Sequence, residues 1–197
     1  EDAVSCFLTS GNSYFGDLSG VFTAPPNAEY IEGHEYIAGL DFGQTDYTAM
    51  PVFDKTTKQQ VDLLHINKTE WSEQRNRIKQ VYDKWRLKSV LAEKNSIGSV
   101  NIEALREIGV YAIPFETTNE SKAAIMSNMH ELLHNGWKLL DIPVQKHEFN
   151  TFVSSQLPSG AWRLAADGDG HDDTVMGCGI CLWSVRIPSP NRLVDFA

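Results

Sequence analysis

Carboxylate side chains end or directly precede apolar runs at three places in this sequence. Asp41 closes one run, Glu93 closes another, and the pair Asp172 and Asp173 precedes a long apolar segment. An acidic side chain that a strand buries loses its hydration, so it needs a cation or a hydrogen-bond partner in compensation. Carboxylates on three separate elements therefore indicate a site for a hard divalent cation, provided that the fold brings them together.

The spacing of apolar residues predicts the elements that carry the first of these acids. Three strand-like runs over Tyr36–Phe42, Thr48–Phe53 and Gln60–Ile66 follow one another with short connections, which is typical of an antiparallel meander. Asp41 lies at the end of the first run, and Asp46 lies in the connection that follows it. This part of the chain therefore presents one strong candidate ligand and one weak one.

Helices and strands are expected to alternate after the meander. The first predicted elements are a helix with Ile78, Val81, Tyr82 and Trp85 on one face, a strand over Ser89–Ala92 with Glu93, a helix that ends at Gly109 and a strand over Val110–Phe115. A helix from the capping box Thr117–Glu120 to Gly136 and a short extended segment over Trp137–Leu140 follow. The last predicted elements are a helix over Val144–Val153, an extended segment over Ala161–Ala165 and a buried helix from Asp173 to about Arg186. Alternation implies parallel strands with right-handed crossovers. The carboxyl ends of such strands lie near the start of a helix packed beside them, so Asp41, Glu93 and Asp172 are expected to meet.

The composition is that of an ordinary globular protein, with 42% apolar and 22% charged residues. No apolar run approaches the roughly 20 residues of a membrane span, so a membrane protein is not expected. The 3 cysteines do not form a disulfide framework, which favours a reducing, intracellular setting. The net charge of −9 argues against a protein that coats DNA, but not against a nuclease, because metal ions neutralise acidic groups locally.

The length of 197 residues is sufficient for one well-buried core with a short extension. Residues 1–34 lack sustained periodicity and contain turn signals such as Pro25-Pro26, so they are interpreted as an N-terminal arm or the linker remnant of a preceding domain. Residues 35–187 are expected to form the folded domain, and residues 188–197 a C-terminal tail.

The order of the elements and the placement of the acids resemble the ribonuclease H-like (retroviral integrase) superfamily, and in detail the nuclease domain of the large terminase subunits of tailed phages. The stretches that carry the resemblance are Leu40-Asp-Phe-Gly43, Ala92-Glu-Lys-Asn-Ser-Ile-Gly98, Thr117-Thr-Asn-Glu-Ser-Lys122 and His171-Asp-Asp-Thr174. The resemblance covers roughly residues 36–186. It implies an α/β fold whose central mixed sheet, an antiparallel meander followed by parallel strands, is flanked by helices.

The same resemblance implies a metal-dependent endonuclease that cuts double-stranded DNA at the start and end of genome packaging. Carried over by position, Asp41, Glu93 and Asp172 would be the catalytic ligands of two Mg²⁺ or Mn²⁺ ions, with Asp173 as an auxiliary acid and Asp46 as a weak candidate. The family protein also has an ATPase domain, but no G-x-x-x-x-G-K-[ST] loop occurs in this chain, so motor activity is not expected here. The implied partners are DNA, the ATPase domain, and the small terminase subunit and portal, in the host cell cytoplasm.

Two other motifs suggest different chemistry. His130-Glu-Leu-Leu-His134 matches the H-E-x-x-H pattern of zinc peptidases, with His147 or Glu148 as a third ligand, but it lacks the H-x-x-G-x-x-H continuation. Cys178-Gly-Ile-Cys181 lies inside an expected apolar helix, which favours small buried cysteines over a redox pair. A zinc peptidase and a non-catalytic docking domain are the alternatives to the nuclease.

Structural explanations also exist for the individual residues. Asp41 and Glu93, taken singly, fit turn residues, and Asp173 fits a helix N-terminus. The candidates for phosphate contacts are Lys122, Arg75, Lys79, Lys84 and Trp162-Arg163. The alternative for all of them is that their side chains are exposed to solvent and contact no DNA.

Overall fold

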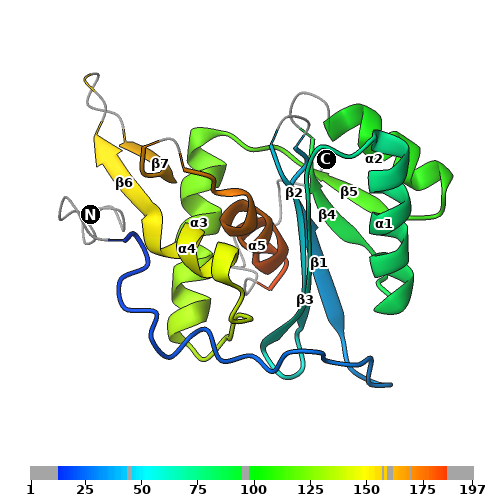
Figure 1. Ribbon diagram of the computed structural model, residues 1–197, viewed down its shortest axis with the longest axis horizontal. Coiled ribbons are helices and arrows are strands. Elements are labelled where there is room, and N and C mark those ends of the chain that lie inside the picture. Colours follow the sequence, from blue (N-terminus) through cyan, green and yellow to red (C-terminus); the bar gives the residue numbers. More distant parts are fainter. Residues whose placement is uncertain are drawn as a thin grey trace, which may run out of the picture.

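A five-stranded mixed sheet separates two helical layers in the computed structural model (Figure 1). The structure describes residues 13–43, 46–94, 98–156, 158, 162–168 and 170–185. The elements are β1 (Tyr36–Leu40), β2 (Thr48–Asp54), β3 (Gln59–Ile66), α1 (Trp71–Lys84), β4 (Val90–Glu93), α2 (Gly98–Glu107), β5 (Ala112–Phe115), α3 (Asn119–His134), α4 (Pro143–Thr151), β6 (Phe152–Gln156), β7 (Trp162–Ala166) and α5 (Asp173–Trp183).

The sheet combines a meander with parallel strands, as the sequence predicts. Its strand order is β3-β2-β1-β4-β5. Strand β2 pairs antiparallel with both β1 and β3, whereas β4 pairs parallel with β1 and with β5. The expected α/β architecture, with its mixed central sheet, is therefore confirmed.

Each face of the sheet has its own hydrophobic core. Helices α1 and α2 cover one face, and α5, with α3 and α4 beyond it, covers the other (Figure 1). Fully buried Ile78 of α1 and Leu105 of α2 belong to the first core, and Ile125 and Met129 of α3 belong to the second. None of the helices in the described part of the chain has the length and apolar character needed to cross a membrane.

Helix α5 lies directly on β1 because a glycine allows the close approach. A Cβ atom added at Gly39 would lie 2.3 Å from the backbone nitrogen of Cys181. On the helix side, a Cβ at Gly177 would lie 2.9 Å from Cδ of Pro51. Cys178 and Cys181 are buried free cysteines in this helix, as the sequence predicts. The close contact fixes the start of α5 beside the end of β1, where the candidate acids lie.

Gly39→Ala is expected to destabilise the domain severely. The new methyl group would overlap backbone atoms of α5, which have no rotamer to change, so the helix must move away from the sheet. We expect a loss of about 3 kcal/mol or more in the free energy of unfolding measured with urea. Gly179→Ala is the control, because its Cβ would meet side-chain atoms rather than backbone, the flexible end of Met126 at 2.8 Å and Cδ1 of Ile125 at 3.3 Å. Equal stability of the two variants would contradict the proposed tight packing.

Two boundaries differ from the sequence-based expectation. The N-cap of α3 is Thr118, not Thr117, because the Thr118 hydroxyl accepts from Ser121 N–H at 3.1 Å and the Ser121 hydroxyl accepts from Thr118 N–H at 2.7 Å. Ser121 thus takes the role expected of a glutamate. The helix predicted to reach Val153 ends at Thr151, because the next residues pair as β6 with β7. Tertiary pairing overrides the local pattern there.

Part of the predicted N-terminal arm packs into the second core. Phe15, Leu18, Val21 and Phe22 are buried there, and Tyr14 N–H donates to the carbonyl of Phe152 at 2.7 Å. Residues 1–12 and the tail 188–197 lie outside the described residues, so the domain boundaries stay a prediction.

Candidate metal centre

Asp41 follows directly on β1 and is held in place through its backbone. Its N–H donates to the carbonyl of Ala49 at 3.0 Å, and its own carbonyl accepts from Ala49 N–H at 3.0 Å. The residue is only 9% exposed. Burial raises the pKa of Asp41 well above its usual value, and a side-chain hydrogen bond with Glu93 and the negative charges of Glu93, Asp173 and Asp172 raise it further. The other three acids that the sequence singles out thus all act on Asp41.

Glu93 reaches Asp41 because of the parallel pairing of the two strands. Leu40 of β1 lies opposite Ala92 of β4, so the next residue of each strand reaches the same edge of the sheet. Helix α2 begins close behind, and a Cβ added at Gly98 would lie 2.1 Å from the carbonyl oxygen of Glu93. The start of α2 therefore lies directly against the end of β4, at the edge where Glu93 stands.

The other two acids stand at the start of α5. Asp172 is the N-cap residue, but its side chain makes no capping hydrogen bond; instead its Oδ2 lies 3.0 Å from Nζ of Lys122. Asp173 is 7% exposed, and its Oδ2 has no hydrogen-bond partner. Burial raises the pKa of Asp173 to about 7, and the charges of Asp46, Glu148 and Asp172 contribute to the rise. Both side chains are thus available to a cation.

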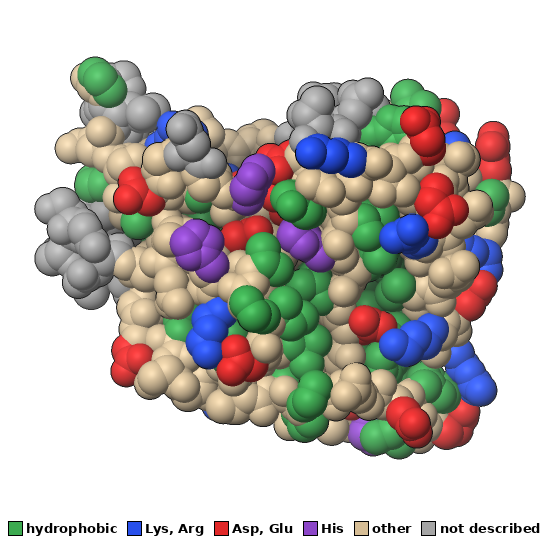
Figure 2. All heavy atoms as spheres, in the orientation of Figure 1, with side chains coloured by type: hydrophobic (Ala, Val, Ile, Leu, Met, Phe, Trp, Pro, Cys, Tyr) green, Lys and Arg blue, Asp and Glu red, His purple; other side chains and the backbone are tan. Residues whose placement is uncertain are grey.

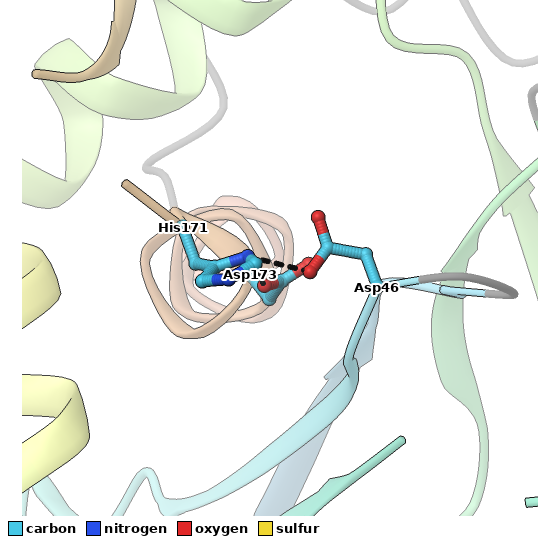
Figure 3. A group of neighbouring side chains, drawn as sticks. All are labelled: Asp46, His171 and Asp173. Atoms are coloured by element: carbon cyan, nitrogen blue, oxygen red, sulfur yellow. Dashed lines mark ion pairs between the residues drawn. The ribbon is translucent and has the colours of Figure 1, made fainter. Parts of the chain in front are cut away.

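Asp46 and His171 extend the acidic cluster toward solvent (Figure 3). Nδ1 of His171 lies 2.6 Å from Oδ1 of Asp46 and 3.8 Å from Oδ2 of Asp173. One ligand atom from each of the three residues lies within 4.8 Å of the other two. Asp46, the weak candidate, therefore does lie at the site. His171 was not proposed as a ligand, although its position beside Asp172 could have suggested it.

A second group of possible ligands consists of His65, Glu148 and Asp173. Ligand atoms from these three residues also lie within 4.8 Å of one another. Figure 2 shows histidine and acidic side chains gathered near the middle of the face in view, over α4, α5 and the adjoining part of the sheet. Burial lowers the pKa of His65, with a further contribution from His171, so its ring is neutral at pH 7. Sequence reasoning missed His65, because β3 carries no local signal of a site.

The donor groups around Asp41 fit a divalent metal ion. Carboxylate oxygens are the ligands that Mg²⁺ and Mn²⁺ prefer. In the absence of a cation, the burial and mutual repulsion of the acids favour the protonated forms of Asp41 and Asp173, and an oxygen of Asp173 is buried without a partner. A divalent cation would reverse this preference by compensating the charges.

Lys122→Met is expected to increase the response of the domain to metal. In the metal-free protein the Lys122 ammonium group compensates the charge of Asp172. Its loss should lower the free energy of unfolding by about 1 kcal/mol, and the melting temperature should fall slightly as a result. Addition of Mn²⁺ should then raise the melting temperature more than in the unmodified domain. Lys55→Met, which removes an exposed ion pair with Glu35, is the control. An identical metal-induced shift in both variants would contradict this role of Lys122.

The H-E-x-x-H motif does not form a metal site in the described part of the chain. The rings of His130 and His134 are 4.4 Å apart, but neither belongs to a group of three possible ligands. His134 Nε2 lies 3.3 Å from the carbonyl of Phe15, and the ring of His130 stacks on Phe15. Glu148, the proposed third ligand, faces Asp173 instead. The two histidines thus anchor the N-terminal segment, and the structure gives the peptidase alternative no support.

The basic residues of α1 are engaged in contacts within the protein. Arg75 donates to Asn101 at 3.1 Å, Lys79 pairs with Asp83, and Lys84 lies 2.7 Å from Asp62. The helix also lies on the face of the sheet opposite α5 (Figure 1). A role for these residues in phosphate contacts stays a prediction.

No family model matches this chain. It is 28% identical over 187 residues to the large terminase subunit of Thermus virus P23-45, and the match covers 88% of this chain and 38% of that protein. The chain is also similar to the large terminase nuclease from the thermophilic phage G20c, in crystal structures with bound magnesium and with bound cobalt. For each of these structures the TM-score is 0.82 and the sequence identity is 26%, and the match covers 89% of this chain and 98% of that nuclease. The nuclease domain of the large terminase of Thermus phage P74-26 has a TM-score of 0.77 and 26% identity over 86% of this chain and 94% of that domain.

These matches confirm the resemblance to the nuclease domains of phage large terminases. The fold is ribonuclease H-like, and the G20c nuclease that it resembles has been solved with magnesium and with cobalt bound. The chain spans about 38% of the length of the large terminase subunit that it matches, and almost all of the separately solved nuclease domains.

Proposed function

We propose that this chain is the nuclease domain of a phage large terminase subunit, and that it hydrolyses phosphodiester bonds of double-stranded DNA. In this function it cuts the concatemeric genome when packaging begins and when it ends. The proposal is supported most strongly by the pairing of β1 with β4, which brings Asp41 and Glu93 to one edge of the sheet, where Asp41 hydrogen-bonds to Glu93 and interacts with the charges of Asp172 and Asp173. The fold around these acids is that of nucleases solved with magnesium and with cobalt.

Asp41, Glu93 and Asp172 are the proposed ligands of two divalent ions, Mg²⁺ or Mn²⁺, with Asp173 as an auxiliary ligand. When bound, such ions supply Lewis-acid activation of a water molecule and of the leaving oxygen. Asp41 contacts Glu93 on the strand side and interacts electrostatically with both acids of α5, so it is the group that the two halves of the site share. Lys122 holds Asp172 in position at 3.0 Å. The tight packing of α5 on β1 keeps the two halves in register.

DNA binding by this piece alone is proposed to be weak and sensitive to salt, because the chain has a net charge of −9. Trp162, which is 38% exposed, and Arg163 lie on β7, and the same strand leads into α5 and its acids. The β6–β7 hairpin is therefore the element we propose to contact DNA near the site. The ATPase domain of the longer protein, the small terminase subunit and the portal are proposed partners, in the cytoplasm of the host cell.

Incubation of supercoiled plasmid with the purified chain tests this function. We expect nicked or linear DNA with Mn²⁺ or Mg²⁺, none with EDTA, and none with the Asp41→Asn variant. The matched control is Asp141→Asn, an exposed acid that pairs with Lys146 at 2.9 Å outside the cluster, which should cut normally. Cutting in EDTA, or undiminished cutting by Asp41→Asn, would overturn the assignment. No cutting together with no metal binding in calorimetry would favour the docking alternative.

A further inference from the structure

Buried polar atoms that lack a hydrogen-bond partner gather beside the acidic cluster. They are Nε2 of His65, Oε1 of Glu148 and Oδ2 of Asp173. The three residues each place a ligand atom within 4.8 Å of the other two. A buried polar atom without a hydrogen-bond partner destabilises the fold, so three in one place indicate a common partner. From this convergence we propose that His65, Glu148 and Asp173 form a separate binding site for a divalent transition-metal ion, here called the His65 site.

Two of the three ligands of the His65 site, His65 and Glu148, are held in position by further contacts. The ring of His65, on β3, stacks on Tyr47 with a centroid separation of 4.1 Å and an interplanar angle of 6°. Glu148, on α4, is 2% exposed, and its Oε2 accepts from the backbone N–H of Thr174 at 2.8 Å and from the Thr174 hydroxyl at 2.6 Å. Those two bonds occupy one carboxylate oxygen and leave Oε1 for the metal. Such supporting contacts are typical of metal sites, where they orient the ligands.

The ligand set indicates which metals the site takes. One imidazole nitrogen and two carboxylate oxygens suit Zn²⁺, Co²⁺ or Mn²⁺ better than Mg²⁺ or Ca²⁺, which prefer oxygen alone. Three protein ligands leave room for water to complete the coordination of zinc. The two negative charges of the carboxylates balance the two positive charges of the ion. The His65 site therefore differs in metal preference from the all-carboxylate group around Asp41.

Occupation of the His65 site would connect three elements and fix one member of the neighbouring cluster. Its ligands come from β3, α4 and α5, which belong to the sheet and to one helical layer. Asp173 is common to this site and to the cluster around Asp41. The proposal goes beyond the nuclease function and does not depend on it, because metal binding by these residues requires no DNA.

Zinc binding to the whole chain in the presence of excess Mg²⁺ tests the proposal by calorimetry. Excess Mg²⁺ competes for the carboxylate cluster, and a loss of zinc affinity on replacement of His65 or Glu148, which belong to the His65 site alone, identifies zinc bound there. We expect one Zn²⁺ per chain, weakened at least about tenfold by His65→Phe and by Glu148→Gln. His65→Phe keeps a ring to stack on Tyr47, and Glu148→Gln keeps the volume, so both variants should fold. His147→Ala, an exposed histidine on α4, should bind zinc normally.

A crystal of the zinc-loaded chain, measured at the zinc absorption edge, locates the ion directly. The expected result is an anomalous peak within coordination distance of His65 Nε2. A peak only between Asp41 and Glu93, or zinc affinity unchanged in His65→Phe, would overturn the proposal. Asp41→Asn should still bind zinc at the His65 site while it loses DNA cutting. Failure of one proposal is thus distinguishable from failure of the other.

Discussion

Replacement of Asp41 by asparagine is expected to abolish metal-dependent DNA cutting and, at the same time, to raise the melting temperature of the metal-free domain. Cutting should fall by on the order of 10³-fold or more, because loss of a shared metal ligand removes several kcal/mol of transition-state stabilisation. Stability should rise because burial and the nearby acids make the ionised form of Asp41 unfavourable in the metal-free fold. Asparagine is neutral, keeps the shape and can donate a hydrogen bond to Glu93 without taking up a proton.

Thermal unfolding at pH 8 in EDTA measures the second half of this prediction. We expect the substitution to increase the free energy of unfolding by about 2 kcal/mol. For a domain of this size, that change corresponds to a rise of about 4–8 °C in the melting temperature. Addition of Mg²⁺ should stabilise the unmodified domain and have little effect on Asp41→Asn. The exposed Asp141→Asn should behave like the unmodified domain in both conditions. A lower melting temperature of metal-free Asp41→Asn would mean that the carboxylate has a structural role, contrary to the proposal.

Sequence reasoning could place Asp41 and Glu93 together because their proximity follows from short-range rules. Both acids end apolar strands, and the intervening helix makes the strands parallel neighbours, so the two carboxyl ends reach the same edge. The position of α5 follows less directly. It depends on Gly39 and Gly177, which allow helix and sheet to approach, and a glycine in a sequence does not reveal which backbone it will touch.

His65 and Glu148 could not be found in the same way. His65 lies near the end of β3, an edge strand of the sheet, and it meets α4 only through packing between layers. Glu148 was considered only as a partner for the H-E-x-x-H histidines, because sequence distance suggested that pairing. The β6–β7 hairpin was recognised only in its second half, because helix α4 passes into β6 at Phe152 without an intervening loop. Contacts between distant elements decide all three features.

The metal-free domain is expected to lose stability as the pH rises from about 4 to about 7, and Asp173 is a main cause. Its pKa is about 7 in the folded protein, against an ordinary value of 3.8. A carboxyl whose pKa is raised by folding contributes its full stability below the unfolded pKa, and this contribution disappears as the pH rises through the folded pKa. A difference of about 3 pKa units corresponds to at most about 4 kcal/mol. Asp41 acts in the same direction.

Urea unfolding of the unmodified domain and of Asp173→Asn at pH 5 and pH 8, both in EDTA, isolates the effect. Titrating groups far from Asp173 are common to both proteins and cancel in the difference, which therefore reports Asp173 and its interactions with the neighbouring acids. As the pH rises, the free energy of unfolding of Asp173→Asn should increase relative to that of the unmodified domain, by up to about 4 kcal/mol. A stability difference that does not change with pH would show that the folded protein does not raise the pKa of Asp173.

Metal ions should oppose this loss, because they bind the ionised carboxylates that become populated as the pH rises. The stabilisation produced by Mg²⁺ or Mn²⁺ is therefore expected to be larger at pH 8 than at pH 6 in the unmodified domain. In Asp41→Asn, Mg²⁺ should produce little stabilisation at either pH, since the shared ligand of the carboxylate cluster is missing. A metal-induced shift of the melting temperature that is equal at both pH values would show that metal binding does not depend on ionisation of the buried acids. The pH dependence thus tests whether the cost of holding these carboxylates together is compensated by the cation they are proposed to bind.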